Sequence, residues 1–180
     1  MNKHLRKIIL IFLVFIAVVM GTMYYRLGTY KPVEFDVVEA KDFNFLYKQH
    51  IGAYHEILEV IEDVEKWAKK HNLDCSKTFG QYLDNPDTTD TDRLRSYGGC
   101  VFDHMQIPNN EDYKYKYEHP RKYLHAVFEG SPAVGPISVY PKAAEWISKN
   151  KAKMDGAVIE VYTVKNGGSG MLTEYYFPIK

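Results

Sequence analysis

An uncharged apolar run, residues 8–25, limits the fold of this chain more than any other feature of its sequence. As an α-helix the run would be roughly 27 Å long, close to the thickness of the hydrocarbon core of a bilayer. In lipid, a single segment satisfies its backbone hydrogen bonds only as a helix. The run therefore predicts one membrane-spanning helix within an N-terminal anchor, residues 1–28.

The charges beside the run predict its orientation. Three basic residues precede it: Lys3, Arg6 and Lys7. The positive-inside rule then predicts a cytoplasmic N-terminus and a domain on the non-cytoplasmic side, although Arg26 and Lys31 follow the run and reduce the asymmetry. A cleaved signal peptide stays open as an alternative, because Val19 and Gly21 form a weak small-residue cleavage site.

The rest of the chain has the size and charge of one soluble domain. About 150 residues follow the anchor, which is enough for one hydrophobic core. The chain has 23 basic and 23 acidic residues, so no basic surface for nucleic acid is expected. The histidines are scattered and no Cys-x-x-Cys occurs, so we expect neither a metal site nor a cofactor.

The two cysteines, Cys75 and Cys100, leave two interpretations open. A disulfide would form if the domain were exported to an oxidising compartment. However, Cys75 follows a predicted helix and Cys100 lies in a predicted strand, and buried free cysteines are common. The sequence therefore favours free thiols.

After an extended linker, residues 29–36, the domain at 37–180 reads as two copies of one β-α-β-β unit. The first copy has a strand, a glycine, a helix and two strands: residues 43–50, Gly52, 54–71, 78–83 and 97–102. Its strands alternate apolar and polar residues, and its helix has apolar residues at steps of three and four. A helix with one apolar stripe needs a sheet to cover.

The second copy repeats this order. Its elements are residues 122–128, Gly130, 138–149, 157–164 and 171–178, with a glycine-rich hairpin turn predicted at 166–170. Aligning Gly52 with Gly130 brings Trp67 within one residue of Trp146. We therefore predict an α+β fold in which two repeats, related by a pseudo-twofold axis, form an antiparallel sheet with two helices and hold a ligand between them.

Four short motifs occur in a specific order along the domain. They are His50-Ile51-Gly52-Ala53-Tyr54, Tyr82-Leu83-Asp84-Asn85-Pro86 with Arg95, Phe128-Glu129-Gly130, and Ile159-Glu160-Val161-Tyr162. In this order they resemble the GyrI-like family, the ligand-reading domain of AraC-type and MerR-type regulators. With the preceding helix, the chain is similar to membrane-anchored GyrI-like proteins of the endoplasmic reticulum. Their domain faces the cytosol, so the opposite orientation also stays open.

The resemblance implies a ligand site. In the regulators, a strand glutamate facing a central groove attracts cationic aromatic ligands, and Glu160 matches it. Because side chains alternate along a strand, Tyr162 should share the face of Glu160, while Ile159 and Val161 should point toward the helices. The mirrored groove positions are expected to be Gln81, Tyr47 and His125.

We thus expect a membrane-anchored domain that binds a small cationic or aromatic molecule, with no catalytic residue assigned. Two other functions stay open. Some free-standing members of the family hydrolyse reactive small molecules with groove carboxylates and tyrosines, and Glu160 with Tyr162 would serve the same chemistry. A membrane-tethered protein-interaction module is the third class.

Overall fold

Two β-α-β-β halves build the folded body, as the sequence predicts. The computed structural model describes residues 3–28, 30–103, 112–165 and 170–180. The first half contains β1 (Glu34–Ile51), α2 (Ile57–Lys70), β2 (Lys77–Tyr82) and β3 (Arg95–Phe102). The second contains β4 (Lys114–Glu129), α3 (Gly135–Lys149), β5 (Val158–Val164) and β6 (Met171–Pro178). Two short 3-10 helices, η1 (Tyr54–Glu56) and η2 (Thr91–Arg93), lie in the first half.

The antiparallel sheet closes on itself. Its strand order, β1-β3-β2-β5-β6-β4, forms a closed barrel in which β1 also pairs with β4. Exchanging β1 with β4, β2 with β5 and β3 with β6 leaves this ring unchanged, as a pseudo-twofold axis requires. The α+β fold is therefore confirmed, with one addition. The two repeats meet at both β1·β4 and β2·β5, so each strand has a hydrogen-bonded neighbour on both sides along part of its length.

The long pairing of β1 with β4 explains the closure. The two strands pair from Glu34↔Val127 to Tyr47↔Lys114, with register shifts around Lys41. β1 thus begins inside the segment expected to be the linker, and β4 begins well before residue 122. Of the predicted hairpin turn, residues 166–169 lie outside the described residues.

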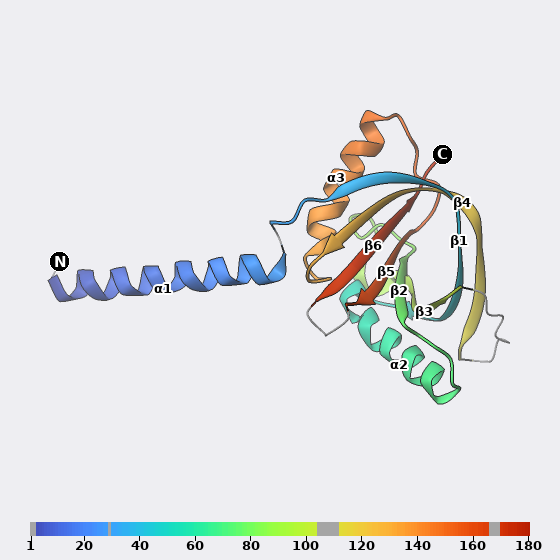
Figure 1. Ribbon diagram of the computed structural model, residues 1–180, viewed down its shortest axis with the longest axis horizontal. Coiled ribbons are helices and arrows are strands. Elements are labelled where there is room, and N and C mark those ends of the chain that lie inside the picture. The colour runs from blue at the N-terminus through green and yellow to red at the C-terminus, as the bar shows by residue number, and fades with distance from the viewer. Residues whose placement is uncertain (1–2, 29, 104–111, 166–169) are drawn as a thin grey trace.

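Hydrophobic clusters define the two faces of the sheet. One cluster contains only strand residues and fills the barrel interior: Phe43, Phe45, Phe79, Tyr123, Ile159, Val161 and Tyr176. Two others lie on the outer face, where α3 adds Val139 and Ala143 to one and α2 adds Val64 and Ala68 to the other. Both helices therefore cover the outside of the barrel (Figure 1).

The helix α2 packs through most of the apolar stripe that its sequence predicts, although Leu58 on that stripe is exposed. In α2 the buried residues are Ile57, Ile61, Val64 and Ala68. The helix approaches β3 closely because Gly98 has no side chain; a Cβ there would lie 3.0 Å from both Ile57 and Ile61. This contact fixes α2 against the first half of the barrel.

Cys75 and Cys100 form a disulfide, with 5.4 Å between their Cα atoms. The expectation of free thiols is therefore wrong. The pairing of β2 with β3 places Thr78 opposite Cys100, so the segment just before β2 passes beside that cysteine. Sequence alone could not reveal this register, because it depends on residues distant in the chain.

The helix α1 (Lys3–Leu27) extends away from the body (Figure 1) and has no buried residue. Among the described residues it is the one helix long and apolar enough to cross a membrane, and a signal sequence would pass the same test. Its C-terminal end is not free, since the amide of Ser131 donates a 3.2 Å hydrogen bond to the carbonyl of Leu27.

Candidate ligand site

Glu160 lies on the outer face of β5, beneath α3. It pairs with Gly80 of β2 and with Tyr175 of β6, and Tyr175 packs in the cluster that contains α3. Ile159 and Val161 point into the barrel. The expectation that these two residues face the helices is therefore wrong. Alternation predicts that neighbours point in opposite directions, but it does not predict which face the helices cover.

Hydroxyl groups satisfy both carboxylate oxygens of Glu160. Tyr140 of α3 donates a 2.8 Å hydrogen bond to Oε1, and Tyr162 of β5 donates a 3.0 Å bond to Oε2. The hydroxyls of Tyr82 and Tyr162 are 2.9 Å apart and share a further hydrogen bond. Glu160 is 2% exposed. Three tyrosines from two strands and a helix therefore enclose one carboxyl group.

Gly80 makes room for this cluster. A Cβ at Gly80 would lie 2.9 Å from the hydroxyl oxygen of Tyr82. Tyr82 lies two residues further along β2, so the two residues share a face. The missing side chain lets the Tyr82 ring fold back over the strand toward Tyr162. Any larger residue at position 80 would displace that hydroxyl.

The electrostatics of the cluster favour a carboxyl group that titrates near neutrality. Burial raises the pKa of Glu160 to about 7, while the hydrogen bonds from Tyr140 and Tyr162 act in the opposite direction. Burial and the charge of Glu160 raise the pKa of Tyr140 and Tyr162 well above the usual value, so both remain donors. Within the described part of the chain, no basic side chain forms an ion pair with Glu160.

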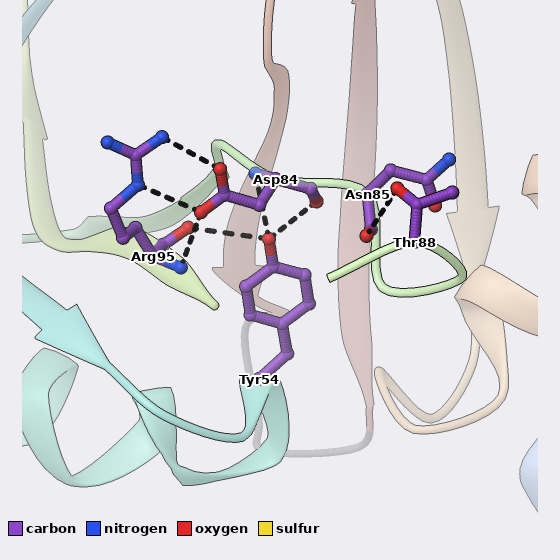
Figure 2. A network of polar contacts seen from close by, with 5 residues as sticks. All are labelled: Tyr54, Asp84, Asn85, Thr88 and Arg95. Atoms are coloured by element: carbon purple, nitrogen blue, oxygen red, sulfur yellow. Dashed lines mark hydrogen bonds and ion pairs between the residues drawn. The ribbon is translucent and has the colours of Figure 1, made fainter. Parts of the chain in front are cut away.

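A network of hydrogen bonds among Tyr54, Asp84 and Arg95, called the clasp below, holds the Tyr54 side chain in place (Figure 2). The Tyr54 hydroxyl donates a 2.6 Å hydrogen bond to the carbonyl of Asp84 and accepts a 3.0 Å bond from its amide. Arg95 holds the Asp84 carboxylate through Nε at 3.0 Å and Nη2 at 2.8 Å, which lowers the pKa of that carboxyl. The Tyr54 ring meets the Tyr82 ring edge-to-face at 4.8 Å. The clasp therefore fixes the start of α2 beside the tyrosine cluster.

The predicted site residues divide between the two faces of the sheet. Glu160 and Tyr162 lie together on the outer face. Tyr47 packs on Tyr97 inside the barrel at 4.5 Å, and Gln81 pairs with the inward-facing Ile159. His125 also faces inward, with Nδ1 2.7 Å from Asp36. The structure thus does not bring these five residues into one site.

Sequence reasoning missed two members of the cluster, Tyr82 and Tyr140. Tyr82 belongs to a motif already noted, and its spacing of two from Gly80 places both on one face. Gln81, the mirrored position expected from the sequence, is one residue short of Tyr82, and a shift of one residue changes the face of a strand. Tyr140 lies three residues before the buried Ala143 in α3, so helical periodicity places it toward the sheet.

A cavity of about 250 Å³ lies on the other face, at one end of the barrel interior. Its walls include Phe43, Val161, Glu174 and Tyr176, and none of the tyrosines that surround Glu160. Glu174 has partners there, since Tyr176 donates a 2.9 Å bond to it and His125 Nε2 lies 3.4 Å away. Glu160 remains the stronger candidate, because a buried carboxylate without a cationic partner is unfavourable until a ligand supplies one.

A metal-dependent site finds no support in the described residues, where no three His, Cys, Asp or Glu side chains form a cluster that could hold an ion. The cluster around Glu160 consists of one carboxyl group and phenolic hydroxyls. Such a set suits an organic cation or a polar small molecule better than a hard metal ion, which prefers several carboxylate or carbonyl oxygens.

Comparison with known proteins identifies the domain. A family model described as the GyrI-like small molecule binding domain matches residues 33–180, which confirms the resemblance of the domain to the GyrI-like family. The crystal structure of the EcmrR C-terminal domain has a TM-score of 0.65 and 14% identity, covering 83% of this chain and 99% of that one. EcmrR in a DNA complex has a TM-score of 0.66 and 13% identity, covering 98% and 69%.

A further solved structure, SAV2435 bound to tetraphenylphosphonium, has a TM-score of 0.54 and 13% identity and covers 82% of this chain and 94% of its own. A hydrolase encoded by lin2189 from Listeria innocua has a TM-score of 0.52 and 10% identity, with coverage of 88% and 98%. At these identities the likeness concerns the fold. No curated protein sequence matches the chain.

Proposed function

We infer that this chain, which belongs to the GyrI-like small-molecule-binding family, captures a small aromatic cation at Glu160. One observation carries the proposal: Glu160 is 2% exposed, and among the described residues only tyrosines donate hydrogen bonds to it. A ligand cation would supply the charge partner that the described residues do not provide. Coulomb attraction between buried charges is several times stronger than in water.

The tyrosines suit the aromatic part of such a ligand. A cation above a tyrosine ring gains about 0.5 to 2 kcal/mol, with the larger values where water is excluded. The site has four tyrosine rings: Tyr54 from η1, Tyr140 from α3, Tyr82 from β2 and Tyr162 from β5. The tetraphenylphosphonium bound to SAV2435 is a ligand of this chemistry. The Tyr140 hydroxyl, which comes from α3, is the donor to Oε1 of Glu160. A ligand therefore reaches this oxygen by replacing the Tyr140 hydroxyl.

The proposal includes a retained membrane anchor with the domain on the non-cytoplasmic side. Three basic residues before the apolar run favour a cytoplasmic N-terminus: Lys3, Arg6 and Lys7. The Cys75–Cys100 disulfide adds independent support, because stable disulfides are rare in the reducing cytosol.

Ligand-induced stabilisation tests the binding proposal. The full chain in detergent is heated with and without tetraphenylphosphonium, beside Glu160→Gln and Glu174→Gln. The second variant is a matched control, since Glu174 also accepts a hydrogen bond from the tyrosine two residues later, but on the inner face. At about 100 times Kd, the cation should stabilise the wild type by about 2.7 kcal/mol. Glu160→Gln should lose this response and Glu174→Gln should keep it.

If all three proteins respond equally, Glu160 is not the charge partner. If none responds, the small-molecule proposal gives way to the protein-interaction module.

A hydrolase is the second candidate, favoured by the carboxyl group of Glu160. With a pKa raised to about 7 by burial, it could accept a proton from water near neutral pH. Prolonged incubation with reactive small electrophiles, followed by product detection, distinguishes turnover from simple binding. Turnover that disappears in Glu160→Gln would favour the hydrolase.

A further inference from the structure

The end of the anchor helix is fixed to the turn that precedes α3. The Ser131 amide donates to the Leu27 carbonyl at 3.2 Å, and a Cβ at Gly130 would lie 2.6 Å from the same oxygen. Lys31 Nζ lies 2.9 Å from Glu129, which Lys165 also contacts. The two lysines hold the pKa of Glu129 at about 2, so the carboxylate stays charged. The two backbones are thus in direct contact, with ion pairs beside them.

This junction places α3 near the lipid surface. Leu27 lies two residues beyond the apolar run, which ends at Tyr25, so a membrane-spanning α1 brings Leu27 to the interface. Ser131 touches Leu27, and α3 begins four residues later at Gly135. Figure 1 shows α1 leaving the body on the side where α3 starts, and α3 running across that side.

The outward face of α3 has the character of a membrane-surface helix. Ile137 is 75% exposed, and Pro141 and Ala144 are also exposed. These residues follow the i, i+4, i+7 spacing and so form one apolar stripe, opposite the buried Val139 and Ala143. A stripe of this kind can face water in other proteins. Here, however, the contact between Leu27 and Ser131 holds the start of α3 close to lipid.

We propose that α3 lies on the bilayer surface, with Ile137 at the boundary between headgroups and acyl chains. The inference rests on the membrane anchor of the proposed function and deepens it. Tyr140, which covers Glu160, is on the same helix three residues after Ile137. The ligand site therefore lies directly below a helix in contact with lipid, and lipophilic cations concentrated in the membrane interface are the class of ligand best placed to reach it.

The internal symmetry provides a matched control. Leu58 of α2 and Ile137 of α3 each lie nine residues before the tryptophan of their helix, Trp67 and Trp146. Leu58 is 59% exposed, so it is a similar apolar surface residue on the helix that lacks the junction with α1. Ile137→Cys and Leu58→Cys are labelled with an environment-sensitive fluorophore in the full chain. The native cysteines are paired, so the unsubstituted chain should take up no label.

The labelled proteins are reconstituted in liposomes that contain lipids with a quencher just below the headgroup. The label at position 137 should emit at a shorter wavelength than in water and be strongly quenched. The label at position 58 should keep the emission wavelength that it has in water and show little quenching. Two results overturn the inference: an aqueous signal at both sites, or equal quenching at both. Flotation of the liposomes and stabilisation by tetraphenylphosphonium are measured on the same samples. Loss of flotation shows that the anchor has failed. If flotation and the response to tetraphenylphosphonium are normal but the label at 137 gives an aqueous signal, the contact of α3 with lipid is refuted, while the anchor and the ligand site stand.

Discussion

The hydroxyl of Tyr140 donates a 2.8 Å hydrogen bond to Oε1 of Glu160 and so joins α3 to β5. Among the residues that the structure describes, it is the one bond to this carboxyl group that comes from a helix, since Tyr162 donates from the strand itself. Opening the site therefore requires a movement of α3 or of the Tyr140 side chain, while the strand part of the cluster can remain in place.

Tyr140→Phe should destabilise the protein mainly when Glu160 is ionised. The ring contacts with Phe177 and Tyr175 would remain, but a bond that lowers the pKa of Glu160 would be lost, so that pKa should rise. At about pH 8.5 we expect a loss of about 1.5 to 3 kcal/mol in the free energy of unfolding, and a smaller loss at about pH 5.5. Denaturant unfolding at both pH values measures it, with the exposed Tyr117→Phe as control. Equal losses at both pH values would count against the role of this bond.

The pH dependence of stability should identify Glu160. Its folded pKa of about 7 lies above the ordinary value of 4.5. The stability it contributes is thus fully present below about pH 4.5 and is lost as pH rises through about 7. Over this window the wild type should lose roughly 3 kcal/mol relative to Glu160→Gln. Urea unfolding of both proteins across the window gives the difference; a constant difference would mean that the carboxyl group titrates normally.

Removing the disulfide should destabilise the domain by about 3 kcal/mol, because it closes a loop of 25 residues. The suitable variant is Cys75→Ser with Cys100→Ala, since Cys100 is 0% exposed and a serine there would bury a hydroxyl. Denaturant unfolding with and without a reductant measures the effect. The reductant should lower the stability of the wild type to that of the double variant. Reaction of both thiols with an alkylating reagent shows that the disulfide has been reduced. If the wild type keeps its stability although both thiols react, the expectation is contradicted.

The clasp around Asp84 should position Tyr54 without taking part in ligand charge recognition. Tyr54→Phe removes the hydrogen bonds to the Asp84 backbone but keeps the ring edge that meets Tyr82. We expect a loss of about 1 kcal/mol in stability and a retained response to tetraphenylphosphonium. Tyr54→Leu removes the ring as well and should weaken that response. Thermal unfolding with and without the cation compares the two, and an identical response in both would exclude the ring from the site.

The order of elements could be predicted because its signals are local. Alternation identified the strands, three-and-four spacing identified the helices, and Gly52 and Gly130 marked the matching points of the two halves. Alternation also placed Tyr162 with Glu160 correctly. These patterns depend on residues close together in the sequence, so one chain is enough to read them.

The remaining features depend on contacts between distant segments. The Cys75–Cys100 disulfide follows from the β2·β3 register, and the closure of the barrel follows from the length of the β1·β4 pairing. The direction in which Glu160 points is decided by which face the helices cover. Tyr140 reaches Glu160 from another element, so no local pattern could join them.

Proton release on ligand binding tests the central claim most directly. Titration calorimetry of tetraphenylphosphonium into the full chain is repeated in buffers of different ionisation enthalpy, from about pH 5.5 to about pH 8.5. If the cation pairs with ionised Glu160, binding should release about one proton at about pH 5.5 and almost none at about pH 8.5, with affinity rising up to about pH 7. Glu160→Gln should show neither effect. Tight binding with no proton release at any pH, unchanged in Glu160→Gln, would contradict the assignment of Glu160 as the charge partner.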